Sequence, residues 1–251
     1  FRKCTREIVQ KFEIKNNFKI KIYSDGANLN DIKKMSALDY ISGLTTNPTL
    51  MKAAGIKDYE KFSKEALKVS NNKPISFEVF ADDLDIIYKQ AKVISSWGNN
   101  VFVKLPITNT KKEFIGGVAK KLTDEGVKIN VTAILTLQQV KAISKCLNPK
   151  IDSIISVFAG RIADTGIDPI PVMIKALDIL KHNSNANLLW ASPREVLNIY
   201  QANKIGCHII TVTPDVLKKL SLYNKNLEEY SLETVKMFFT DAKESNFTIN
   251  L

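Results

Sequence analysis

Lys104 lies in a short run of β-branched and aromatic residues, Val-Phe-Val-Lys-Leu-Pro at 101–106, which is typical of a buried strand. Lysine is rarely buried without a partner, and burial disfavours its charged ammonium form. A neutral amine attacks carbonyl carbons, which is the first step of Schiff-base chemistry. Taken alone, the pattern favours a strand-end lysine whose ammonium group reaches solvent. The chemical interpretation therefore depends on the polar residues that accompany Lys104.

Polar residues also stand in or just after the other apolar runs. Glu78 lies between Phe77 and Val79, where a carboxylate needs a polar or charged partner. The further candidates are Asp25, Asn47, Asn130, Thr132, Ser156, Arg161, Ser192 and Arg194. Several of them have ordinary structural explanations, such as turns, helix caps and surface ion pairs. Together, however, an amine, two carboxylates, amides, hydroxyls and two arginines fit an aldol cleavage or transfer on a sugar phosphate.

The chain alternates short apolar runs with longer amphipathic ones. The expected strands are 19–23, 41–44, 75–80, 101–105, 129–134, 154–158, 188–191 and 208–211. Helical patterns between them include 61–69, 84–95, 111–123, 137–146, 171–182 and 194–203. Eight such units in one domain of this length predict an α/β fold, a single closed (β/α)8 TIM barrel, with an open doubly wound sheet as the alternative. In this barrel the carboxyl ends of the strands meet at one face, where the candidate residues would converge.

Local signals refine the expected elements. Thr136 and the pair Ser192-Pro193 are expected to cap helices, and Gly126 and Gly206 to end them. Residues 1–18 are expected to form a short N-terminal extension, and residues 19–251 the catalytic barrel. The last helical pattern, 227–244, either closes the barrel or packs against a neighbouring subunit. In the second case the protein would be a homo-oligomer.

Composition narrows the class of protein. The 251 residues are 45% hydrophobic and 25% charged, and the net charge is +10. The lysines are spread along the chain, which argues against a nucleic-acid partner and suits the attraction of phosphorylated metabolites. Three cysteines without paired spacing indicate a reducing cytoplasm, and two distant histidines give no metal site. No apolar stretch approaches the roughly 20 residues of a membrane span, so no membrane partner is expected.

Five segments resemble signatures of the transaldolase family, the class I Schiff-base enzymes that include fructose-6-phosphate aldolases. They are GLTTNPTL at 43–50, VKLP at 103–106, INVT at 129–132, SVFAGRIAD at 156–164 and ASPR at 191–194. They occur in the family's order and cover most of the chain. Pro193 departs from the family pattern, which has an aromatic or aliphatic residue between Ser192 and Arg194.

The resemblance implies a role for each matching residue and requires no cofactor. Lys104 would form the imine with a ketose, and Asp25 would be the acid/base at the sugar hydroxyl. Water would be held and activated by Glu78 with Thr132. The dihydroxyacetone unit would be contacted by Asn47, Asn130, Ser156 and Phe158, and the phosphate by Arg161, Ser192 and Arg194.

The resemblance also separates two activities. Fructose-6-phosphate aldolases carry a glutamine where this chain has Glu78 and a tyrosine where it has Phe158. Phe158 has no proton to donate to an enamine, which favours transfer to an aldose phosphate over simple cleavage. We therefore expect a transaldolase that uses sugar-phosphate substrates, fructose 6-phosphate or sedoheptulose 7-phosphate. The alternatives are a simple aldolase, a transaldolase for another anionic sugar such as a sulfosugar, and a non-catalytic basic binding protein.

Overall fold

The computed structural model describes residues 18–249. Eight parallel strands close into a barrel in sequence order. They are β1 (Lys21–Asp25), β2 (Ile41–Thr45), β3 (Ile75–Glu78), β4 (Val101–Pro106), β5 (Ile129–Ile134), β6 (Ser153–Val157), β7 (Ala186–Trp190) and β8 (Ile209–Val212). The predicted (β/α)8 TIM barrel is confirmed, and the predicted strand limits differ from the observed ones by no more than two residues.

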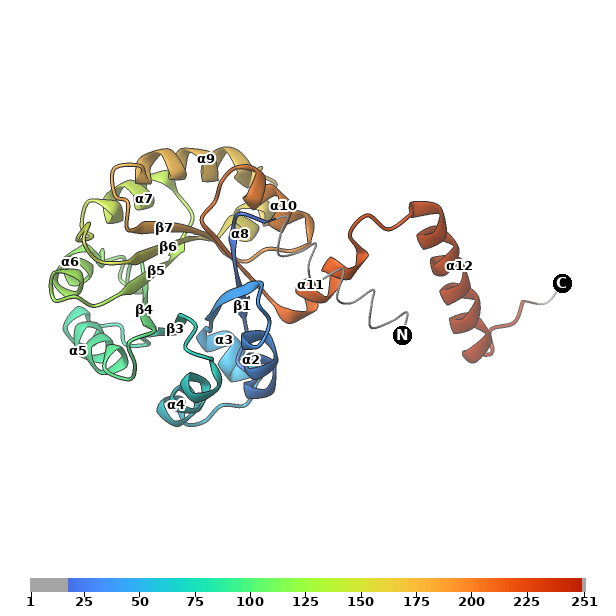
Figure 1. Ribbon diagram of the computed structural model, residues 1–251, viewed down its shortest axis with the longest axis horizontal. Coiled ribbons are helices and arrows are strands. Elements are labelled where there is room, and N and C mark those ends of the chain that lie inside the picture. The colour runs from blue at the N-terminus through green and yellow to red at the C-terminus, as the bar shows by residue number, and fades with distance from the viewer. Residues whose placement is uncertain (1–17, 250–251) are drawn as a thin grey trace. The chain divides into compact units, whose positions relative to one another are not determined.

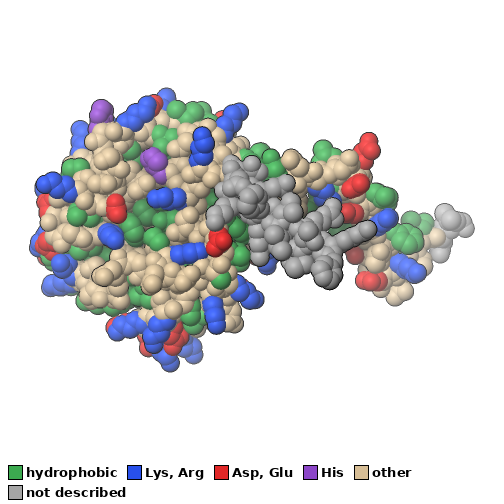
Figure 2. All heavy atoms as spheres, in the orientation of Figure 1, with side chains coloured by type: hydrophobic (Ala, Val, Ile, Leu, Met, Phe, Trp, Pro, Cys, Tyr) green, Lys and Arg blue, Asp and Glu red, His purple; other side chains and the backbone are tan. Residues whose placement is uncertain are grey.

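Helices follow the strands and surround the barrel (Figure 1). They are α2 (Leu29–Ser36), α3 (Pro48–Ala53), α4 (Tyr59–Val69), α5 (Leu84–Ser95), α6 (Gly116–Asp124), α7 (Leu137–Ser144), α8 (Ala159–Asp164), α9 (Pro169–Leu180), α10 (Leu197–Lys204) and α11 (Pro214–Lys218). None of the helices within residues 18–249 has both the length and the apolar character to cross a bilayer. On the face in Figure 2, Lys and Arg side chains are spread over the barrel and do not form one patch.

The chain divides into two compact units, the second of which comprises Lys218–Leu251. This unit contains a short 3-10 helix, η1 (Lys219–Leu222), and the long helix α12 (Leu227–Glu244), whose limits match the prediction. No residue of α12 is buried. The predicted N-terminal extension, residues 1–18, lies outside the described residues except for Phe18.

Local capping signals are confirmed at three of the four predicted places. Thr136 and Gln139 form a reciprocal capping box at the start of α7. Gly126 and Gly206, with φ of 81° and 77°, adopt the left-handed conformation that glycine allows after a helix. The prediction for Ser192-Pro193 is wrong, because α10 begins only at Leu197 and the residue before it is αR.

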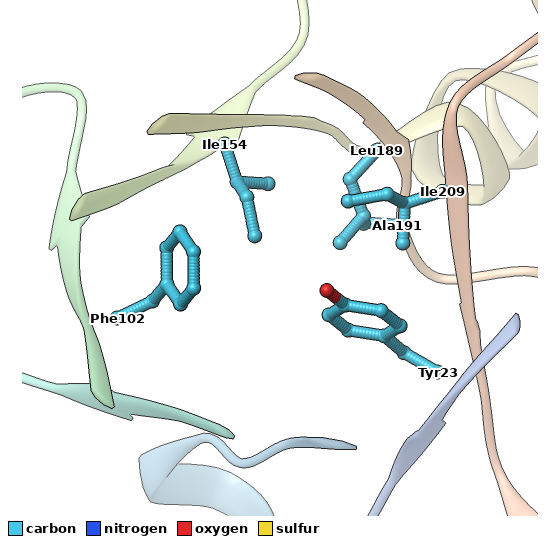
Figure 3. Close-up of a cluster of buried hydrophobic side chains, with 6 residues drawn as sticks. All are labelled: Tyr23, Phe102, Ile154, Leu189, Ala191 and Ile209. Atoms are coloured by element: carbon cyan, nitrogen blue, oxygen red, sulfur yellow. The ribbon is translucent and has the colours of Figure 1, made fainter. Parts of the chain in front are cut away.

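An apolar cluster fills the barrel interior one layer below the polar residues. Its members are Tyr23, Phe102, Ile154, Leu189, Ala191 and Ile209. Their side chains point toward one another (Figure 3) and come from β1, β4, β6, β7 and β8, with Ala191 directly after β7. Tyr23, Phe102 and Ile154 each precede a polar site residue by two positions, so they share its inward face. Gly43 is required here, because a Cβ atom at this position would lie 2.4 Å from the Tyr23 ring. Because these side chains are buried, the cluster excludes water from the barrel interior beneath the polar residues.

Candidate active site

A pocket of about 580 Å³ opens at the carboxyl ends of the strands. Its lining includes all the residues selected from sequence: Asp25, Asn47, Glu78, Lys104, Asn130, Thr132, Ser156, Phe158, Arg161, Ser192 and Arg194. Residues from separate strands and loops thus meet in one cavity, as the barrel topology requires.

Lys104 lies inside the barrel with only 7% of its surface exposed. Strand register places Glu78 of β3 directly opposite Lys104, and the two side chains form an ion pair with 3.1 Å between Nζ and Oε2. The ammonium group also donates to the carbonyl oxygen of Thr46 at 3.1 Å. The amine therefore has a carboxylate within hydrogen-bond distance that can take its proton, which is what nucleophilic attack requires.

Asp25 ends β1 and accepts a hydrogen bond from Thr45 Oγ1 at 2.8 Å. Burial raises the pKa of the Asp25 carboxyl above its ordinary value, and the charge of Lys104 and the Thr45 hydrogen bond offset part of that rise. A carboxyl group whose pKa is raised toward neutrality can both accept and return a proton in one catalytic cycle.

Asn130 is held in a chain of side-chain hydrogen bonds across three strands. Ser156 Oγ donates to Asn130 Oδ1 at 2.7 Å, and Asn130 Nδ2 donates to Ser76 Oγ at 3.1 Å. All three residues are buried. The chain fixes which end of the Asn130 amide faces each neighbour, so its second N–H has one defined direction.

Thr132 carries a buried hydroxyl group that has no hydrogen-bond partner among the described residues. The strand is irregular directly after it, because the β5–β6 register shifts between Val131 and Ile134 and Ala133 has a φ of 60°. Bulges and left-handed residues of this kind are concentrated at functional sites, where they redirect side chains. The unpaired hydroxyl suits contact with a water molecule or a substrate.

Arg161 and Arg194 lie at the mouth of the pocket. Arg194 forms a bidentate pair with Asp164, with 3.0 Å from Nε to Oδ1 and a second contact from Nη2 to Oδ2. Hydrogen bonding to Arg194 holds the pKa of Asp164 below its ordinary value. Arg161 lies over the ring of Phe158, with 5.6 Å from Cζ to the ring centroid. Two guanidinium groups therefore stand where an anionic substituent would enter.

Ser192 has a φ of 60°, a left-handed conformation that is rare for serine. Its carbonyl oxygen approaches Gly160 so closely that a Cβ atom on Gly160 would lie 1.5 Å from it. Since α10 begins at Leu197, the prediction that a helix N-terminus directly follows Ser192 is wrong. The Ser192 hydroxyl is positioned by a packed loop crossing.

Asn47 caps α3, because its side-chain oxygen accepts from the backbone N–H of Leu50 at 2.9 Å. With Oδ1 engaged in the cap, the Nδ2 amide is the part of the side chain that can donate to a ligand in the pocket.

Two residues that contact the site did not stand out in the sequence: Ser76 and Thr211. Thr45 lies in the signature at 43–50, but no role was predicted for it. Each of the three is a normal β-strand residue, so its type alone carries no signal. Ser76 precedes Glu78 by two positions and Thr211 follows Ile209 by two, so period-two spacing would have placed them on the inward face. Their partners depend on the register between strands, which the sequence does not state.

The fold and this lysine-centred pocket define a barrel enzyme family, and comparison with known proteins gives its identity. Residues 22–251 match the family model described as Transaldolase/Fructose-6-phosphate aldolase. A protein of Dehalococcoides mccartyi named "Probable transaldolase" is 34% identical over 80% of this chain and 90% of its own length. "Probable transaldolase 2" of Listeria monocytogenes is 32% identical over 84% and 94%.

The chain belongs to the transaldolase/fructose-6-phosphate aldolase family. Among solved structures, an HpcH/HpaI aldolase/citrate lyase family protein from Burkholderia cenocepacia is similar with a TM-score of 0.57, over 88% of this chain and 98% of that one. At 13% identity this likeness concerns the barrel fold alone.

Proposed function

We propose that this protein is a transaldolase that moves a dihydroxyacetone unit from a ketose phosphate to an aldose phosphate through a Schiff base on Lys104. The observation that carries the proposal is the buried Lys104–Glu78 pair in a pocket that also holds Asp25 and two arginines. Family membership supports the reaction class.

The reaction begins when Glu78 takes a proton from Lys104 and the neutral amine attacks the ketose carbonyl carbon. The resulting carbinolamine loses water to give the iminium ion, which accepts electrons readily. Glu78 and the unpaired hydroxyl of Thr132 lie in the same pocket, and they support the removal and later return of that water.

Asp25 then accepts the proton of the hydroxyl group at C4, and the C3–C4 bond breaks. The electrons of the C3–C4 bond move into the iminium group to form an enamine, and an aldose phosphate leaves. When an acceptor aldehyde arrives, the enamine attacks it, and Asp25 returns the proton to the new hydroxyl. Hydrolysis of the imine releases the longer or shorter ketose phosphate and restores Lys104.

Asn130, Asn47 and Ser156 supply hydrogen bonds for the hydroxyl groups of the three-carbon unit. Two observations support these roles: hydrogen bonds hold the Asn130 amide in one orientation, and the Asn47 side chain is held by the helix cap. Arg161, Ser192 and Arg194 at the mouth suit the phosphate, because guanidinium N–H groups form strong hydrogen bonds to phosphate oxygens. Nε and Nη2 of Arg194 already bond Asp164, so its remaining N–H groups would bind the phosphate.

Product analysis tests the proposal. Purified protein with fructose 6-phosphate should form a new ketose phosphate only when an aldose phosphate acceptor is added. Free dihydroxyacetone released without an acceptor, at a rate equal to transfer, would identify a simple aldolase. A preference for sulfonated ketoses would redefine the substrate and keep the chemistry.

We also propose that the protein works in the cytoplasm. Cys146 and Cys207 are free thiols in the described part of the chain, as a reducing compartment allows.

A further inference from the structure

Thr211 of β8 joins Asp25 through a second hydroxyl group. Its Oγ1 lies 2.5 Å from Thr45 Oγ1, and Thr45 Oγ1 lies 2.8 Å from Asp25 Oδ1. Thr45 is 2% exposed and Thr211 is 7% exposed, so both hydroxyl groups are largely withdrawn from bulk water. Three neighbouring strands, β8, β1 and β2, supply the three members of this hydroxyl chain.

The protons available fix the direction of the chain. A threonine hydroxyl has one proton and two lone pairs. While Asp25 is ionised, the single proton of Thr45 lies on its bond to the carboxylate, so Thr211 must donate to Thr45. When Asp25 carries a proton on Oδ1, both bonds can reverse, and Thr45 then donates to Thr211. Thr211 thus completes the hydrogen bonding of Thr45 in both protonation states.

We propose that Thr211 is a positioning residue for the aldol step, which acts on Asp25 through Thr45. Hydrogen bonds in a chain polarise one another, so donation from Thr211 strengthens the bond from Thr45 to the carboxylate. It also prevents Thr45 from rotating away, because its oxygen is held from both sides. The chemical part of this inference rests on the proposed function, and the structural part does not.

The charged groups around Asp25 set the background for the effect of Thr211. Lys104 on β4 favours the ionised carboxylate, and Glu78 on β3 is paired with Lys104. Tyr23 lies one layer below on β1, and burial raises the pKa of its hydroxyl to about 12, so it stays neutral. Arg161 and Arg194 line the same pocket. Burial raises the Asp25 pKa, and the charge of Lys104 lowers it. The hydrogen bond from Thr45 also lowers the Asp25 pKa, and it comes from an uncharged group.

The test compares Thr211→Val, which keeps the shape and removes the hydroxyl, with Thr211→Ser, which keeps the hydroxyl. Carbon-13 NMR of the full chain labelled at aspartate carboxyls follows the Asp25 titration, with Asp25→Asn to assign the signal. We expect Thr211→Val to raise the Asp25 pKa by about 0.1–0.7 unit, because the bond from Thr45 to the carboxylate persists and loses only the strengthening that Thr211 gives it. Thr211→Ser should return it to near the wild-type value.

Thr123→Val is the matched control. Thr123 is a fully buried threonine in α6, and its hydroxyl group donates only to backbone carbonyl oxygens. The substitution should lower stability without moving the Asp25 titration. Thr211→Ala gives the same titration test if the valine variant does not fold. An Asp25 titration that is equal in wild type and in a folded Thr211→Val or Thr211→Ala protein would overturn the inference.

Activity provides the second measurement. Because the aldol step needs ionised Asp25, the acid limb of the kcat profile should move to higher pH in Thr211→Val by the same amount as the titration, and Thr211→Ser should reverse this. A lower kcat with an unmoved acid limb would assign Thr211 a purely structural role and overturn the proposal. If the titration moves but no variant or wild type shows aldol chemistry, the proposed function fails and the hydroxyl chain stands.

Discussion

Lys104 owes its chemical environment to two neighbouring strands. Glu78 on β3 and Asn130 on β5 lie directly opposite it in register, so an acid, an amine and an amide form one row across the barrel. A buried ion pair of this kind contributes little to stability, because desolvation offsets the attraction between the charges. The presence of this ion pair in a pocket is therefore better explained by reactivity than by a contribution to folding.

Phe158 should decide the fate of the enamine. Replacing it by tyrosine, as Phe158→Tyr, places a hydroxyl group near the three-carbon unit that can protonate the enamine. We expect release of free dihydroxyacetone without an acceptor to rise at least several-fold while transfer falls. Quantifying dihydroxyacetone enzymatically checks this, and Phe158→Leu, which adds no proton donor, is the control. Unchanged release in the tyrosine variant would contradict the assigned role of this ring.

Arg161 and Arg194 should act on the phosphate and not on the bond-breaking step. Because one hydrogen bond to a charged group is worth about 1.5–3 kcal/mol, we expect Arg161→Gln or Arg194→Gln to raise the KM of fructose 6-phosphate roughly ten- to 100-fold. Unphosphorylated fructose should react equally poorly with wild type and with either variant. Equal losses for both sugars would instead show that the arginines support the barrel mouth.

Residue types at strand ends, with the family resemblance, selected residues that all line the pocket, because apolar runs reveal where strands end. The chemical roles of these residues stay predictions. The contacts within the pocket were not predictable. The Thr45–Thr211 and Asn130–Ser76 bonds depend on strand register and closure, and neither has a local signature.

The strands were predicted well and the short helices were not. Near-continuous apolar runs identify the strands of a parallel barrel. Helices α3 and α8 are only 6 residues long, too short for a clear 3.6-residue pattern. The helix expected from residue 111 begins at Gly116, because the preceding residues form a loop in which Asn109 Oδ1 accepts from the backbone N–H groups of Lys111 and Glu113.

Gly160 should be indispensable for the loop that carries Ser192. In Gly160→Ala the new methyl group meets the Ser192 carbonyl, so one backbone segment must move, at a cost of about 1–3 kcal/mol or more. Urea unfolding measures this loss, and the KM of a phosphorylated ketose should rise with it. Gly117→Ala in α6 is the matched control, because no atom lies within 4 Å of its new Cβ. Equal stability of the two variants would contradict the proposed crossing.

At the scale of the whole molecule, the site exists because the sheet closes into a barrel. Strands that are distant in sequence therefore have their carboxyl ends at the same rim. For the proposed sugar-phosphate substrates, the diffuse positive charge would add long-range attraction without a dedicated patch. The single barrel was predictable from the rhythm of its eight units.

Helix α12 carries an apolar stripe, Leu232, Val235, Phe238 and Phe239, whose members are all more than half exposed. A unit of this size cannot bury such a stripe by itself. One of the two interpretations of this helix from sequence, that it packs against a neighbouring subunit, predicts that light scattering reports a homo-oligomer. Phe238→Ser with Phe239→Ser should shift the mass toward the monomer, and Lys236→Ser is the control. A monomeric wild type at micromolar concentration would contradict this.

The most direct test of the central claim is covalent trapping at Lys104. The full chain is incubated with fructose 6-phosphate and borohydride, digested, and analysed by peptide mass spectrometry. The account predicts a reduced three-carbon or ketose adduct on Lys104, and none in Lys104→Met under the same conditions. An unmodified Lys104 after trapping with fructose 6-phosphate, sedoheptulose 7-phosphate and sulfonated ketoses, in a folded protein, would contradict it.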